Sequence, residues 1–312
     1  MKRALLAFAV ALISILATAF FRSQVPDDAD MTRLYATPLP APQGPLSVFH
    51  IGHSLVNRDM PAMLAQLAGE GHSYNSQLGL GTTLKAHWGD APINGFEAEN
   101  DHDRFRPARE AVASGDYDAI VLTEMVEIRD AIAYFDSPEY LALWANAALK
   151  ARPDVRLYLY ETWHPLDDPA GWLTRLETDF ARYWDAEILR PALAELPEGA
   201  LIYVIPAGQA LAALVEAAEA QGGVGNVGDR NDLFALQPDG TRDMIHLNDL
   251  GNYFVALVHY AVLYQKDPTG LPFQLKRADG SLADAPTPEA GRLMQEIAWK
   301  AARYTQLTGV AR

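Results

Sequence analysis

The chain has 312 residues, which suits one large domain or two small ones, and 49% of its residues are hydrophobic. This composition can supply a buried core and excludes a disordered chain. Lys and Arg number 25 against 40 Asp and Glu, giving a net charge of -15, so the surface repels nucleic acid and anionic lipid. We therefore expect no nucleic-acid partner, and we leave the oligomeric state open.

The sequence contains no cysteine. This excludes disulfides, thiol nucleophiles and thiolate metal sites. Eight histidines remain as candidate metal ligands, but no H-E-x-x-H motif occurs. We expect neither a metal nor another cofactor, and we interpret His50, on an apolar run, as a hydrogen-bonded core residue.

The first residues have the pattern of an export signal. Lys2 and Arg3 precede an apolar run over residues 4–21, within which Ala-Thr-Ala provides the small residues of a cleavage site. A run of about 18 residues is also near the lower limit for crossing a bilayer, so an uncleaved membrane anchor is the alternative. In either case we expect the remainder to be periplasmic or secreted.

Residues 22–45 are polar and Pro-rich without helical or strand periodicity, which is typical of a linker. From residue 46 to the end, β-prone runs alternate with amphipathic helical patterns, which indicates one domain. We expect strands over residues 46–51, 117–125, 155–163 and 201–205, and helices over 60–67, 138–150, 172–184, 209–221, 246–264 and 287–308. This alternation predicts an α/β fold, in which helices cover both faces of a parallel sheet and ligands bind at the carboxyl ends of the strands.

Ser54 is the first candidate for chemistry. It lies in Gly52-His53-Ser54-Leu55, after the first predicted strand and just before the first helix, so its hydroxyl should reach the carboxyl edge of the sheet. A serine needs a base within hydrogen-bond reach to become a nucleophile, and a helix N-terminus can help an oxyanion. The alternative is a serine that only caps the helix or completes the turn.

The second candidate is the pair Asp243 and His246, three residues apart before a predicted helix. The carboxylate can accept from one imidazole nitrogen, which leaves the other nitrogen free to take a proton from serine. The alternative is a helix-capping aspartate beside a core histidine.

Together, the glycine-serine-leucine turn and the Asp-x-x-His sequence at the last helix resemble the SGNH/GDSL hydrolases, a superfamily of serine esterases. The Gly-x-Ser-x-Gly motif of the α/β-hydrolases does not accompany them. The resemblance extends from about Leu46 to Tyr264. It implies a flavodoxin-like three-layer α/β/α sandwich with a mainly parallel five-stranded sheet, and a catalytic triad of Ser54, His246 and Asp243.

The resemblance also implies an oxyanion hole made by the Ser54 amide, a glycine after the second strand and usually an asparagine after the third. Gly81 suits the second position, with Gly79 as the other choice. The asparagine is missing, and Thr123-Glu124 occupies that region. Thr123 can donate a hydrogen bond, whereas an ionised Glu124 cannot, and it opposes an oxyanion unless it is protonated or turned away.

Five residues are candidates for substrate binding. They are predicted to lie near the same edge of the sheet: His53, Trp88, Glu124, Trp163 and His164. Aromatic side chains beside polar ones can line a sugar-binding cleft. Core packing of Trp163 and a solvated loop at Trp88 are the alternatives.

We therefore expect an exported serine ester hydrolase that removes a short acyl group, such as acetyl, from a carbohydrate or small ester. An O-acyltransferase with the same triad, in which a sugar hydroxyl replaces water, is the first alternative. A non-catalytic glycan-binding or scaffold protein is the second, because the oxyanion asparagine is missing.

Overall fold

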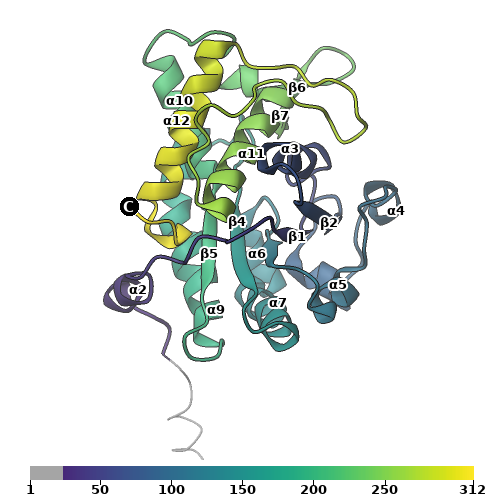
Figure 1. The fold of residues 1–312 in the computed structure, drawn as a ribbon, viewed down its shortest axis with the longest axis vertical. Coiled ribbons are helices and arrows are strands. Elements are labelled where there is room, and N and C mark those ends of the chain that lie inside the picture. Colours follow the sequence, from purple (N-terminus) through teal and green to yellow (C-terminus); the bar gives the residue numbers. More distant parts are fainter. Residues whose placement is uncertain (1–23) are drawn as a thin grey trace, which may run out of the picture.

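The computed structural model describes residues 24–312, so the predicted export signal or anchor at residues 1–21 lies outside the described residues. The main sheet has five strands, all parallel, in the order β2-β1-β3-β4-β5 (Figure 1). The strands are β1 (Ser47–Ile51), β2 (Ser73–Gln77), β3 (Ala119–Leu122), β4 (Arg156–Glu161) and β5 (Ile202–Pro206).

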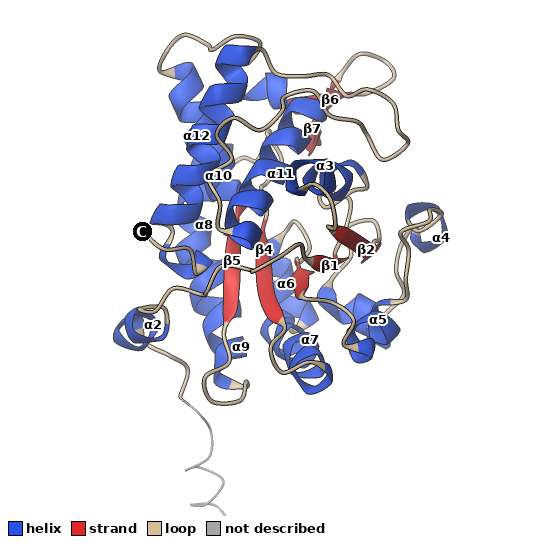
Figure 2. Ribbon diagram, in the orientation of Figure 1, coloured by secondary structure: helices blue, strands red, loops and turns tan. Residues whose placement is uncertain are grey.

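Helices cover both faces of the sheet, which confirms the predicted three-layer α/β/α architecture (Figure 2). One layer contains α3 (Asp59–Ala68), α10 (Ala207–Glu219), α11 (Asp249–Tyr264) and α12 (Pro288–Tyr304). The other contains α5 (Ala108–Ser114), α7 (Ser137–Ala151), the π-helix η2 (Phe180–Leu189) and α9 (Arg190–Ala194). The remaining helices are α2 (Asp28–Leu34), η1 (Ala86–Asp90), α4 (Phe96–Glu99), α6 (Ile128–Phe135), α8 (Trp172–Asp179), η3 (Arg230–Leu233) and η4 (Gln306–Thr308).

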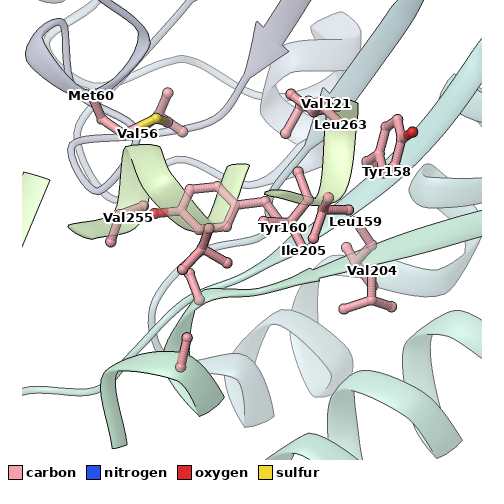
Figure 3. Packing of buried hydrophobic residues seen from close by; sticks show 14 of the residues in the cluster. Val56, Met60, Val121, Tyr158, Leu159, Tyr160, Val204, Ile205, Val255 and Leu263 are labelled. Atoms are coloured by element: carbon pink, nitrogen blue, oxygen red, sulfur yellow. The ribbon is translucent and has the colours of Figure 1, made fainter. Parts of the chain in front are cut away.

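The central strands β3, β4 and β5 are apolar along most of their length because helices bury both of their faces. Side chains alternate between the two faces, so Tyr158 and Tyr160 face one layer and Leu159 faces the other. Tyr160 lies against α11, where its ring centroid is 4.6 Å from that of His259, and Val255 of the same helix lies nearby (Figure 3).

The strand order places β1 between β2 and β3, because the chain passes from β1 to β2 on one side and then crosses over to β3 on the other side of β1. In open α/β sheets such a switch point opens a crevice at the carboxyl ends of the strands. Ser54 follows β1 directly and therefore lies at this position.

The segment predicted as a linker is packed onto the domain over its described residues, so this interpretation is wrong for residues 24–45. Asp27 and Asp30 form a capping box that starts α2. Met31 and Tyr35 are buried, and the Tyr35 hydroxyl donates to the Ile202 carbonyl over 2.5 Å. In the described part of the chain, no helix is both long and apolar enough to cross a bilayer.

A small antiparallel hairpin, β6 (Phe234–Leu236) and β7 (Arg242–Leu247), replaces the start of the helix predicted over residues 246–264. The helix α11 begins only at Asp249, because the Asn248 side chain caps it by accepting from the amides of Leu250 and Gly251. The prediction that His246 starts this helix is therefore wrong, and Asp243 and His246 both lie on β7.

Candidate active site

A tight turn after β1 carries Ser54. Within it, the amide of Val56 donates to the His53 carbonyl over 2.8 Å. The helix α3 that follows is capped by Asn57, whose Oδ1 accepts from the amides of Asp59 and Met60 at 2.7 and 3.0 Å. Ser54 is therefore not the cap of this helix, and its side chain is available for another role.

The structure brings the three predicted triad residues together. Nε2 of His246 lies 3.0 Å from Oγ of Ser54, and Nδ1 of the same ring lies 2.9 Å from Oδ2 of Asp243. The Asp243 side chain is only 11% exposed, whereas that of His246 is 43% exposed. The imidazole thus has a mostly buried carboxylate on one side and the hydroxyl of the partly exposed Ser54 on the other.

Asp243 accepts four hydrogen bonds. Its Oδ1 takes the backbone amides of Ile245 and His246, each at 2.9 Å, and its Oδ2 takes the His246 ring and the Gln237 side chain. Partial burial raises the pKa of this carboxyl, but the hydrogen bonds outweigh burial and lower the pKa below its usual value. Asp243 is therefore ionised and fixed in orientation. Sequence reasoning missed Gln237, because no local motif marks it.

The loop after β4 donates two hydrogen bonds to the backbone of β7. The indole N–H of Trp163 donates to the Ile245 carbonyl over 2.8 Å, and the amide of Leu166 donates to the Met244 carbonyl over 2.7 Å. Trp163 is 1% exposed. The prediction that it binds substrate is wrong, because its ring is buried and its polar atom holds the residue before His246.

His164 is also buried, so its predicted contact with substrate is wrong as well. Its Nε2 lies 3.1 Å from Oδ2 of Asp179, which also accepts from Arg175 over 2.6 Å. Two further carboxylates, Asp168 and Glu127, pair with the same guanidinium. Burial is the main reason why the pKa of His164 falls to about 4. This ionic cluster anchors the loop that carries Trp163.

His53 and Glu124 were predicted to bind substrate, but both are fully buried. Nε2 of His53 donates to the Glu124 carbonyl over 2.8 Å, and its Nδ1 accepts from the Leu55 amide. The Glu124 carboxylate accepts from Ser137 and from the amides of Leu84 and Met125. Burial raises its pKa to about 7, although these hydrogen bonds oppose the shift. Both residues therefore stabilise the turn that carries Ser54 from its buried side, and neither lines the site.

Thr123 was predicted as an oxyanion donor, and this is wrong. Its hydroxyl is buried and donates to the Tyr160 carbonyl over 2.6 Å. The backbone amides of Ser54 and Gly81 differ from the Thr123 hydroxyl, because neither donates to a backbone carbonyl among residues 24–312. Gly81 is exposed and has a φ of 53°, a conformation that favours glycine. These two amides remain the predicted donors.

Trp88 is partly buried beside this loop. Its ring meets Trp144 edge-to-face, with 4.9 Å between centroids, and the Arg109 guanidinium lies 3.7 Å from its centroid over one face. A contact between Trp88 and substrate stays a prediction.

No family model matches the sequence, and no curated protein matches it. Among solved structures, the chain is similar to the crystal structure of a DUF4886 family protein from Bacteroides uniformis, with 18% sequence identity and a TM-score of 0.49. The alignment covers 85% of this chain and 99% of that chain. This similarity assigns neither a family nor an activity.

Proposed function

We propose that the protein is a serine ester hydrolase of the SGNH type, with Ser54 as nucleophile, His246 as general base and Asp243 as the acid that orients the base. The observation that carries the proposal is the continuous hydrogen-bond chain from the Ser54 hydroxyl through both imidazole nitrogens to the Asp243 carboxylate. An ionised Asp243 requires the proton on Nδ1 of His246, so Nε2 is the nitrogen that accepts from serine.

Catalysis then proceeds by acyl transfer in two steps. Nε2 of His246 takes the hydroxyl proton while Ser54 Oγ attacks the ester carbonyl, and the imidazolium returns that proton to the departing alcohol. The backbone amides of Ser54 and Gly81 stabilise the oxyanion. Water, deprotonated by His246, next attacks the acyl-serine and releases the acid and the free enzyme.

The position of Glu124 supports an active rather than a non-catalytic protein. Three hydrogen bonds hold its carboxylate among Leu84, Met125 and Ser137 in the interior. The Glu124 carboxylate, whose negative charge would oppose an oxyanion, is therefore hydrogen-bonded in the interior.

For the substrate we propose a short acyl group, such as acetyl, on a carbohydrate or small ester outside the cytoplasm. The apolar segment over residues 4–21 motivates the location. The test measures release of acetate from an aryl acetate by the wild type and by Ser54→Ala, with and without an excess of glycan. We expect Ser54-dependent hydrolysis without glycan. Turnover that requires the glycan would contradict the hydrolase proposal and would indicate an acyltransferase.

A further inference from the structure

The loop that carries Gly81 is fastened at both ends to the same residue, Gly52. At its start, the main-chain carbonyl of Gln77 accepts from the Gly52 amide over 3.2 Å. At its end, Nε2 of His87 contacts the Gly52 carbonyl at 2.7 Å. The Gln77 side chain then closes a ring of three residues, because its Nε2 lies 2.9 Å from Nδ1 of His87.

The direction of each hydrogen bond in this ring is determined. Oε1 of Gln77 accepts from the amide of Ala108 over 2.8 Å, so its amide nitrogen points to His87. That nitrogen can only donate, so Nδ1 of His87 accepts and the ring proton must be on Nε2, from which it is donated to the Gly52 carbonyl. His87 is 3% exposed, and burial lowers its pKa to about 4, which keeps the ring neutral near pH 7.

Gly52 is closely packed within this arrangement, with no room for a side chain. A Cβ atom at this position would lie 2.4 Å from Cγ2 of Thr123 and 2.7 Å from Cγ2 of Val56. Ser54 follows two residues later, and the Glu124 carboxylate holds the Leu84 amide in the same loop. The nucleophile turn and the Gly81 loop are therefore joined on the buried side by side-chain hydrogen bonds.

We propose that His87 is a positioning residue, which sets the place of Ser54 relative to the backbone amides of the Gly81 loop. The inference rests on the proposed function, since it concerns the distance between the nucleophile and its oxyanion donors. A shift of about 1 Å in such a site lowers the rate by about a hundredfold, so this link should act on kcat rather than on KM.

Two substitutions separate the two hydrogen bonds of His87. In His87→Gln (H87Q), the amide nitrogen takes the place of Nε2 and keeps the bond to the Gly52 carbonyl. In His87→Asn (H87N), the amide oxygen takes the place of Nδ1 and keeps only the bond to Gln77. We expect H87Q to retain kcat within about threefold, and H87N to lose about tenfold or more in kcat with KM little changed.

Equal kcat values in the two variants, or a change confined to KM, would overturn the proposal. The measurement is the hydrolysis of an aryl acetate at a temperature where circular dichroism shows both variants folded. A wild type without Ser54-dependent turnover would contradict the proposed function instead. A second readout would then test whether His87 positions the two loops.

The second readout is NMR of the deuterated protein and does not depend on turnover. We expect the wild-type His87 ring to carry its proton on Nε2, and the amide signals of Ser54 and Gly81 to shift in H87N but not in H87Q. Unchanged signals in a folded H87N would overturn the positioning role. A wild-type ring protonated on Nδ1 would overturn it as well, and that readout does not require H87N to fold.

Discussion

Gln237 donates a hydrogen bond to Oδ2 of Asp243 over 2.6 Å. The same oxygen contacts Nδ1 of His246. Gln237 lies on the exposed turn between β6 and β7, so an accessible side chain helps to orient the partly buried carboxylate. The carboxylate that we propose orients the base is thus itself oriented by a residue outside the proposed triad.

Replacing Gln237 by Ala should weaken catalysis without unfolding the protein. We expect kcat/KM for an aryl acetate to fall by about threefold to tenfold, because one hydrogen bond to a charged group is lost at a partly solvated position. The matched control is Gln221→Ala, which removes an exposed glutamine side chain that donates to the Ala217 carbonyl on α10. An equal effect of both substitutions would contradict a role for Gln237 in the site.

Asp243→Asn should abolish most activity while preserving the geometry of β7. The Asn carbonyl can still accept the amides of Ile245 and His246, but its amide group donates to Nδ1 and moves the ring proton to Nε2. We expect kcat to fall by about a thousandfold or more. Kinetics below pH 8 with enzyme of verified fold provide the measurement, and a loss under tenfold would contradict the assigned tautomer.

Trp163→Phe should lower kcat because it removes the hydrogen bond that holds the Ile245 carbonyl beside His246. We expect a loss of about tenfold. Trp172→Phe is the matched control, since Trp172 is equally buried and its indole nitrogen has no acceptor within residues 24–312. A similar loss of kcat in both variants would show that only packing matters.

Acid should destabilise the fold through the buried pair His50 and His259, whose ring centroids lie 6.1 Å apart between β1 and α11. Burial lowers the pKa of His50 well below its usual range and that of His259 to about 4. Both rings bind protons in the unfolded chain near pH 6.5 but not in the folded one. The free energy of unfolding is therefore highest above about pH 6.5 and falls as the pH drops towards 4.

His50→Met removes one of these rings at similar volume. Urea denaturation at pH 7 and pH 5 should show that the variant loses less stability on acidification than the wild type, by on the order of 1 kcal/mol. An identical loss in both proteins would contradict the effect.

His50 was expected to be a hydrogen-bonded core residue, and it is buried, but neither ring nitrogen has a partner in the described part of the chain.

Local patterns in the sequence predicted the elements that local physics decides. The buried apolar runs became the central strands, and Ser54 follows β1 as expected. The predicted start of α11 at His246 is wrong because Asn248, which precedes an apolar run, is the stronger capping signal. The capping box at Asp27 and Asp30 could likewise have revealed α2.

The substrate-facing residues were predicted poorly for a different reason. Trp163 and His164 lie near the end of β4, as expected, but position along a strand does not determine whether a side chain points to solvent or to the interior. Gln237 and His87 were not assigned their roles because their partners, Asp243 and Gly52, come together only in the folded chain.

Covalent labelling of Ser54 tests the central claim most directly, because a fluorophosphonate probe needs no knowledge of the natural substrate. The wild type is incubated with the probe, digested, and mapped by mass spectrometry beside Ser54→Ala and His246→Ala. We predict one modified peptide carrying the adduct on Ser54, no adduct in Ser54→Ala, and strongly slowed labelling in His246→Ala. A wild type that remains unmodified, or equal labelling of all three proteins, would contradict the account.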